Sequence, residues 1–449
     1  MKQEQSIRMK KQMLLLFSLL ILVLHPASCQ TSQAYTARAD SESFTENYAA
    51  TLADYTQAIH LDSLRAELYN KRADARFLHR DFAGALNDYS KAIALKPAYD
   101  VAFFNRGMTE IELQQFKKAI SDFTRAIKID STLAPEYSNR GRAKNELGYY
   151  KDALRDFNKA IRMDSTHAGI YVNRGCSRLG LKDYAGAMAD FDKALILDPA
   201  DAECYYNRGN ACESVKDYQA SMKNYNKAIS LNPAYSQAYN NRAYLKSETG
   251  DSTGAMADYS HSLEQNPHNA NAYFNLANFK TQKGDYQGAL KDLNKAIENK
   301  KDYSKAYYNR GLLRYTLQDL SGASQDYTKA IEYDSAFVLA YNNRGAVRGK
   351  LKDQKGAIAD YSRAISYDPA FEQAYSNRGY QKVKLQDFQG ALADLNKALT
   401  LNPEHGDAYA YRGLAYYGLH KKEEACAEFR KALQKGSLNA GSLITNYCH

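Results

Sequence analysis

A small residue returns every 34 positions along almost the whole chain, and this period constrains the fold more than any other feature. Twelve copies of the unit run from Ser32 to Asn439 without an insertion or a deletion. Self-similarity at this period indicates one supersecondary unit stacked on copies of itself. The small residues are Ala39, Ala73, Gly107, Gly141, Gly175, Gly209, Ala243, Ala277, Gly311, Gly345, Gly379 and Gly413.

The spacing of residues within one copy predicts two helices. Tyr341, Gly345 and Arg348 recur at helical spacing, and Ala357 and Tyr361 do so after a short break. Each unit is therefore expected to be a helical hairpin. Prolines near the end of many copies cannot continue the second helix, and an aspartate that can cap its free backbone N–H groups often precedes it. These aspartates are Asp81, Asp183, Asp217, Asp285 and Asp353.

The unit closely resembles the tetratricopeptide repeat. The resemblance rests on the 34-residue length, an aromatic at position 4, small residues at positions 8, 20 and 27, and an aromatic or leucine at position 24. It implies an all-α fold, a right-handed α-solenoid superhelix of twelve stacked 34-residue helical hairpins whose first helices line an inner groove. Positions 7 and 11, usually apolar in the family, are mostly Arg or Lys here. The hairpins span residues 32–65, 66–99, 100–133, 134–167, 168–201, 202–235, 236–269, 270–303, 304–337, 338–371, 372–405 and 406–439, and residues 440–449 form a C-terminal tail that we expect to cover the last hairpin.

The N-terminus has the segmentation of an export signal. Basic residues precede an apolar run from Met13 to Leu24, which is too short to span a bilayer but suits a signal peptide over residues 1–29. Cleavage after Cys29 would give a soluble protein, whereas cleavage before it would leave a cysteine that could carry a lipid. Both remain open, as does the start at Met1 or Met9. We expect an exported protein, in the periplasm, outer-membrane-associated or extracellular.

Composition excludes several classes of function. The net charge of +9 includes a basic cluster in the signal segment, so the remaining surface is only mildly positive and predicts no nucleic-acid partner. The nine histidines form no HxxxH or HExxH pattern, and no phosphate-binding loop or nucleophile–base pair is present. We expect no enzyme activity, no cofactor and no metal. Cys176, Cys204, Cys212, Cys426 and Cys448 show no paired spacing and are interpreted as buried free thiols.

The recurring triplet Asn-Arg-Gly divides into separate roles, because residues two apart lie on different sides of a helix. The Gly or Ala is expected to let the second helix approach. The Arg, as in Arg344, has an Asp sixteen residues later, as in Asp360, and we expect a partly buried ion pair between the two helices. The less favoured alternative is a basic ladder that faces a ligand.

The Asn points away from the small-residue stripe and is the candidate for binding. An amide offers donors and an acceptor to the backbone of an extended peptide, and the resemblance implies a ladder of such side chains on the groove wall. A solvated polar residue copied with the repeat is the alternative. The candidate rungs are Asn105, Asn139, Asn173, Asn207, Asn241, Asn275, Asn309, Asn343 and Asn377.

The sequence therefore predicts a non-enzymatic scaffold that binds an extended polypeptide or a partner protein in its groove outside the cytoplasm. The alternative is a module that binds a glycan or the cell wall through tyrosines and asparagines on the same face. The family's clamp for chaperone C-termini is not expected, because no lysine precedes the rung asparagines. Partner identity and oligomeric state do not follow from the sequence.

Overall fold

The computed structural model describes residues 31–42 and 47–448. Across this part the chain is helical without strands, in consecutive pairs of helices followed by a short terminal helix. The all-α solenoid of helical hairpins is thereby confirmed. The predicted signal segment, Cys29 and four residues of the first hairpin lie outside the described residues.

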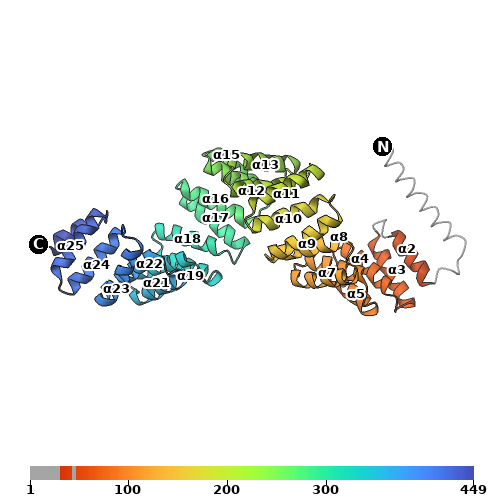
Figure 1. Cartoon of the computed structure of the whole chain (residues 1–449), viewed down its shortest axis with the longest axis horizontal. Coiled ribbons are helices and arrows are strands. Elements are labelled where there is room, and N and C mark those ends of the chain that lie inside the picture. The colour runs from red at the N-terminus through yellow and green to blue at the C-terminus, as the bar shows by residue number, and fades with distance from the viewer. Residues whose placement is uncertain (1–30, 43–46, 449) are drawn as a thin grey trace. The chain divides into compact units, whose positions relative to one another are not determined.

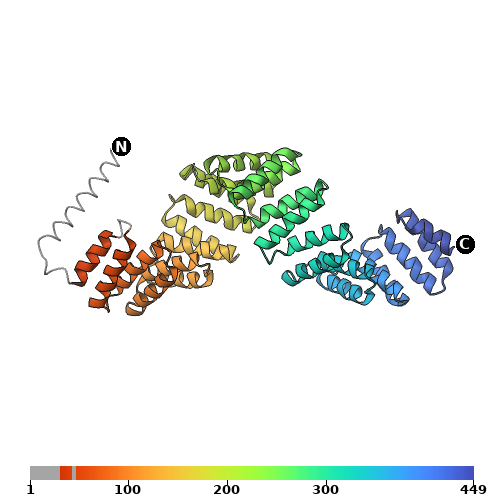
Figure 2. The ribbon, with the colours of Figure 1, turned by 180° about the vertical axis from the view of Figure 1, so that it is seen from behind.

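The chain divides into two compact units, one up to Pro233 and one from Ala234. In each unit, the two helices of a pair pack on each other and each second helix packs on the first helix of the next pair (Figure 1). The reverse view shows the same succession of neighbouring helices inside each unit (Figure 2). The first unit contains α2 (Ser32–Glu42), α3 (Tyr48–Leu61), α4 (Ala66–Leu78), α5 (Phe82–Leu95), α6 (Asp100–Glu112), α7 (Phe116–Ile129), α8 (Ala134–Glu146), α9 (Tyr150–Met163), α10 (Ala168–Gly180), α11 (Tyr184–Leu197), α12 (Ala202–Ser214) and α13 (Tyr218–Leu231).

The second unit repeats the arrangement and adds one helix. Its members are α14 (Ser236–Glu248), α15 (Ser252–Gln265), α16 (Ala270–Gln282), α17 (Tyr286–Asn299), α18 (Ser304–Thr316), α19 (Leu320–Tyr333), α20 (Val338–Lys350), α21 (Gln354–Tyr367), α22 (Glu372–Lys384), α23 (Phe388–Leu401), α24 (Gly406–Gly418), α25 (Lys422–Gln434) and α26 (Ala440–Tyr447). The last helix packs on α24 and α25, where Leu443 joins a cluster with Ala410, Ala432 and Ala440.

The core of each hairpin forms where an aromatic or a leucine of the second helix meets the small residue of the first. Tyr361 is almost fully buried, and a Cβ added to Gly345 would lie 2.9 Å from its ring. Real Cβ atoms do not approach so closely, so the glycine provides the space that the ring occupies. Gly175 and Phe191 repeat this contact. The structural role predicted for the small residue is confirmed.

The predicted caps are also confirmed. The side chain of Asp353 accepts a hydrogen bond from the backbone N–H of Gly356, 2.9 Å away, at the start of α21. This satisfies one of the donors that a helix N-terminus leaves free. The same cap opens α5, α11, α13 and α17.

Candidate functional site

The arginine of the triplet donates two hydrogen bonds to the aspartate on the second helix of its own hairpin. Arg344 donates from Nε to Asp360 Oδ2 at 2.9 Å and from Nη2 to Oδ1 at 2.6 Å. This is the planar geometry for which guanidinium is suited, and Asp360 is only 3% exposed. The predicted ion pair is confirmed. It recurs as Arg38–Asp54, Arg72–Asp88, Arg106–Asp122, Arg140–Asp156, Arg174–Asp190, Arg242–Asp258, Arg310–Asp326, Arg378–Asp394 and, with glutamate, Arg412–Glu428.

A cation at position 11 of the repeat contacts the same aspartate in eight hairpins, and in seven of them it joins the triplet arginine there. Arg348 Nη1 lies 2.9 Å from Asp360 Oδ2 and also donates to the Gly356 carbonyl. The sequence showed basic residues at this position but no partner for them. Their common role follows only from the structure, which brings them to a carboxylate twelve residues later. The eight cations are Arg76, Lys144, Arg178, Lys246, Lys280, Arg314, Arg348 and Lys382.

The triplet arginine also contacts the preceding hairpin. Arg344 Nη1 donates to Thr328 Oγ1 on α19 at 3.1 Å, and its guanidinium lies 5.6 Å from the centroid of the Tyr341 ring. A side chain held by a carboxylate, a hydroxyl and a ring has few donors left for a ligand. This row of arginines therefore joins helices rather than forming a basic ladder for binding.

The asparagines lie on a different side of the first helices, and all nine are half-buried. Five of them donate from Nδ2 to a side chain on the first helix of the preceding hairpin. These bonds run from Asn105 to Asp74, Asn275 to Asn240, Asn309 to Asn278, Asn343 to Tyr308 and Asn377 to Asn342, at 2.7–3.2 Å. The asparagine row is thus a surface of stacked first helices and, at the same time, a set of links between hairpins.

The other four rungs differ from these five. Asn139 donates to the Pro135 carbonyl within its own helix, and Asn241 accepts from Asn240. At Asn173 the backbone carbonyl accepts from the side chain of Asn145 in the preceding hairpin. Asn207 shares the half-buried setting of the others. Sequence reasoning identified the row but not these partners.

Aromatic rings lie beside the rungs. Tyr308 packs on Phe337 with ring centroids 4.8 Å apart, and its hydroxyl accepts the hydrogen bond from Asn343. In the last hairpin Tyr411 takes the rung position and stacks on Tyr380 at 4.3 Å. The face therefore combines amides with flat apolar surfaces.

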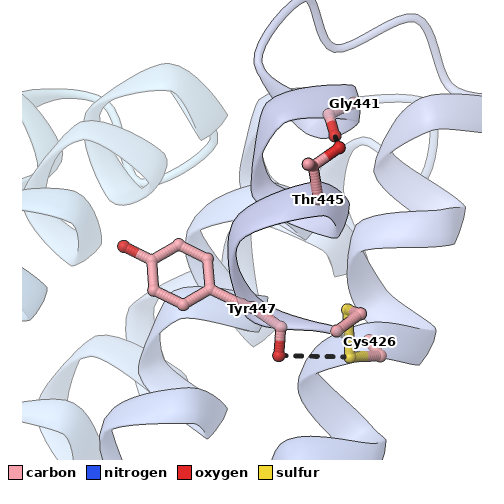
Figure 3. Close-up of a disulfide and its surroundings, with 5 residues drawn as sticks. Cys426, Gly441, Thr445 and Tyr447 are labelled. Carbon is pink, nitrogen blue, oxygen red and sulfur yellow. Dashed lines mark hydrogen bonds between the residues drawn. A yellow bond between two sulfur atoms is a disulfide. The ribbon is translucent and has the colours of Figure 1, made fainter.

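Cys426 and Cys448 form a disulfide, so the prediction of free thiols is wrong for this pair (Figure 3). Their Cα atoms are 5.7 Å apart, within the range for a disulfide. Cys448 lies beyond the last repeat, and α26 folds back to bring it to α25. The Tyr447 carbonyl oxygen lies 3.9 Å from Cys426 Sγ in the same contact.

The other three described cysteines are free, as predicted. Cys204 and Cys212 are buried and Cys176 is half-buried. Burial raises the pKa of the Cys176 and Cys204 thiols to about 12. A thiol that stays protonated is a poor nucleophile, so these two thiols are expected to be unreactive.

Two further properties of the described residues bear on the site. Over residues 31–42 and 47–448, His, Cys, Asp and Glu side chains nowhere gather in a group of three or more that could hold a metal ion. Within the same residues, every helix is too short or too polar to cross a membrane.

Comparisons with known proteins agree with this architecture. Four models described as tetratricopeptide repeat match residues 101–133, 138–202, 202–235, 224–257, 259–291, 304–337, 338–371 and 376–440. No curated protein matches the chain.

Solved structures with the same kind of fold include three that differ in length. The Cut9–Hcn1 hetero-tetramer of the APC/C matches over 96% of this chain and 98% of its own, with 13% identity and a TM-score of 0.45. A tetratricopeptide repeat protein from Parabacteroides merdae covers 55% of this chain and 99% of its own, with 22% identity and a TM-score of 0.40. YrrB, described as a TPR protein with an unusual peptide-binding site, covers 42% of this chain and 97% of its own, with 24% identity and a TM-score of 0.33. With family matches that run, with short gaps, from residue 101 to residue 440, the chain belongs to the tetratricopeptide-repeat family.

Proposed function

We propose that this protein is a non-enzymatic scaffold that binds an extended segment of a partner protein along the asparagine rungs of its first helices. The tetratricopeptide-repeat fold supports a role in protein–protein interaction. The proposal adds where the partner binds and through which groups. Each compact unit carries its own row, Asn105 to Asn207 in the first and Asn241 to Asn377 in the second.

The observation that carries the proposal is the hydrogen bonding of the rungs. An asparagine side chain has two N–H donors and an acceptor oxygen. Asn309 uses one donor to reach Asn278 Oδ1 at 2.7 Å, and this bond fixes the orientation of its amide. An amide that is already oriented loses little entropy when a ligand binds. The remaining capacity of the amide matches the alternating N–H and C=O groups of an extended backbone.

The disulfide supports the proposal that the protein works outside the cytoplasm. Disulfides persist in oxidising compartments and are rare where thiols are kept reduced. The Cys426–Cys448 bond therefore favours export, in agreement with the signal segment expected over residues 1–29. Anchoring through a lipid on Cys29 stays a second proposal, and mass spectrometry of the mature N-terminus tests it.

Fluorescence anisotropy with a labelled, unstructured peptide tests the groove. We expect the variant Asn309→Ala plus Asn343→Ala to bind about tenfold more weakly, because each lost hydrogen bond contributes roughly 0.5–1.5 kcal/mol. The matched control is Gln287→Ala plus Gln389→Ala, which removes two exposed amides from second helices. Equal affinity of the two variants would contradict the proposal.

Asn139→Ala separates binding from loosened stacking. Its amide donates within its own helix, so the substitution cuts no bond between hairpins. We expect weaker peptide binding, with a loss of only a few tenths of a kcal/mol in the free energy of unfolding. Unchanged binding would assign the rungs a structural role only.

A glycan ligand is the second candidate, and the stacked pair Tyr380 and Tyr411 favours it, since sugar rings pack on such faces. Retention of the protein on insoluble cell-wall polymer, lost in Tyr380→Ala, would support this candidate. Peptide binding that survives Tyr380→Ala would support the first.

A further inference from the structure

The third hairpin lacks the cation that eight hairpins place against the buried aspartate. Its position 11 is Glu110, so two carboxylates, Glu110 and Asp122, face one guanidinium, that of Arg106. The remaining three hairpins have Glu42, Cys212 and Tyr416 at this position. The third hairpin therefore has a carboxylate where a positive charge is the rule.

Glu110 is buried and its carboxyl group is incompletely satisfied. The residue is 6% exposed, and its Oε2 atom is buried with no hydrogen-bond partner within the described structure. A buried polar atom without a partner has lost its hydrogen bonds to water and has gained none in return. This loss would be removed by a donor that enters from outside.

A hollow beside Glu110 gives such a donor room to enter. It has a volume of about 370 Å³ and is lined by residues of the second helices α5 and α7 and of the first helix α6. Arg106, Glu110, Lys118 and Asp122 line it, together with Leu86, Ser90 and Ser121. Lys118 donates to Gln115 Oε1 at 2.8 Å, so its ammonium group is held on its own helix.

The other hairpins show which group fits beside the aspartate. Lys144 Nζ lies 2.7 Å from Asp156 Oδ2 in the next hairpin along the chain. Lys382 Nζ lies 2.8 Å from Asp394 Oδ2 and also donates to the Gly390 carbonyl at 3.3 Å. An ammonium group has three donors and no acceptor. The third hairpin offers the equivalent aspartate and the equivalent carbonyl, that of Lys118, and adds the Glu110 carboxyl.

The electrostatics of the hollow favour the same class of ligand. Burial and the neighbouring Asp122 raise the pKa of Glu110 to about 7, against the opposing effect of Arg106 and Lys118. A cation placed between two carboxylates favours their ionised forms. Binding of a cation should therefore release a proton from Glu110 near neutral pH.

We propose that the hollow between α5, α6 and α7 binds a primary ammonium group on a flexible alkyl chain, and that its source is a lysine side chain of a partner polypeptide. The ammonium takes the place beside Asp122 that lysine or arginine of the chain itself takes in eight hairpins. The site shares no residue with the asparagine rungs. It therefore stands independently of the proposed groove.

The ninth hairpin provides an internal comparison. A hollow of about 540 Å³ lies there beside Asp326, but Arg314 Nη1 is already 2.9 Å from Asp326 Oδ2. With its cation in place, this hollow should not bind an amine. Glu110→Lys should convert the third hairpin to the same filled state.

The test titrates the full chain, ¹³C-labelled at glutamate carboxyls, with Nα-acetyl-lysine methylamide. The Glu110 resonance is identified by its loss in Glu110→Gln. We expect a saturable shift of this resonance and about tenfold weaker binding of the Nε-acetylated analogue, which lacks the charge. No saturable shift, or equal shifts with both compounds, would overturn the proposal.

Two further arms make the test specific. Glu110→Lys should keep its helical circular dichroism and lose the binding of the probe, and binding that survives this substitution would refute the site. Butylammonium distinguishes the sources: weaker binding than the lysine derivative supports a polypeptide, whereas equal binding counts against it. Asn139→Ala should bind the lysine probe normally, so failure of the groove proposal and failure of this one are distinguishable.

Discussion

Two neighbouring hairpins of the second unit place different sets of cations beside their buried aspartate. In the hairpin of α14 and α15, Asp258 is held by Arg242 and Lys246. In the hairpin of α16 and α17, Leu276 replaces the arginine, and Lys280 is the cation beside Asp292. Both carboxylates are buried, and both hairpins keep the same helix lengths.

The pKa values of the two aspartates show the consequence. Burial raises the pKa of Asp258, but the hydrogen bonds from Arg242 and Lys246 outweigh it and hold the pKa below its ordinary value. Burial also raises the pKa of Asp292, and Lys280 does not fully compensate, so this pKa stays above its ordinary value. The arginine–aspartate pair is therefore one way to join the two helices of a hairpin and not a condition for the hairpin, since Lys280 alone pairs with Asp292. Leu276 instead packs in a cluster with Ala243, Tyr259 and Phe279.

The largest expected effect comes from removing the buried aspartate in each of these two hairpins. Asp258→Ala leaves Arg242 and Lys246 without their shared carboxylate, and we expect a loss of about 3–5 kcal/mol, as for other broken buried ion pairs. Asp292→Ala leaves only Lys280, whose flexible side chain can reach solvent, and should cost about 1–2 kcal/mol. Amide hydrogen exchange in α14–α15 and in α16–α17 measures each loss locally. Equal losses would contradict the interpretation.

The last hairpin extends the comparison to a covalent link. Unlike these two hairpins, it has no basic residue at position 11, where Tyr416 stands, and its Cys426 is joined to Cys448 across 22 residues. Cys448→Ser should lower the free energy of unfolding of α25 and α26 by about 3 kcal/mol, because the disulfide restricts the unfolded chain. Urea unfolding with and without a reductant checks this. Cys176→Ser, the control, should leave the response to the reductant unchanged.

Two asparagine rungs allow a hydrogen bond between hairpins to be compared with one inside a single helix. Asn377→Ala removes a bond to Asn342 in the preceding hairpin, whereas Asn139→Ala removes a bond inside one helix. We expect the free energy of unfolding to fall by about 1 kcal/mol in Asn377→Ala and by a few tenths of a kcal/mol in Asn139→Ala. Unfolding followed by circular dichroism measures both. A larger effect of Asn139→Ala would show that the links between hairpins contribute little.

The smallest expected effect concerns how stability depends on pH, because the contributions of the two aspartates have opposite signs. The lowered pKa of Asp258 gives stability that is present above the unfolded pKa and lost as pH falls through the folded pKa. The raised pKa of Asp292 gives stability that is present below the unfolded pKa and lost as pH rises through the folded one. Leu276→Arg should move the Asp292 pKa downward, which ¹³C NMR of labelled aspartate carboxyls detects. An unchanged pKa would mean that the new guanidinium does not reach the carboxylate.

The sequence was sufficient for the parts of the structure that follow the period. The hairpins, the glycine contacts and the pairing of Arg344 with Asp360 recur in register, so one copy explains the others. Cys448 lies outside the period, and no spacing rule connects it to Cys426. The partners of the rungs could not be predicted either. Asn309 reaches back 31 residues and Asn377 reaches back 35, because the choice depends on which neighbouring side chain can accept.

The contact of most triplet arginines with the preceding hairpin has a consequence for how such a chain can change in length. The accepting group on the neighbouring second helix is Thr328 for Arg344, Ser362 for Arg378 and Asn396 for Arg412. Hydroxyl and amide oxygens both accept this hydrogen bond, so the contact between hairpins does not require one particular side chain. Loss or duplication of one 34-residue segment through unequal recombination would join surfaces that already fit. The protein can thereby gain or lose whole hairpins without further substitutions at the new interface.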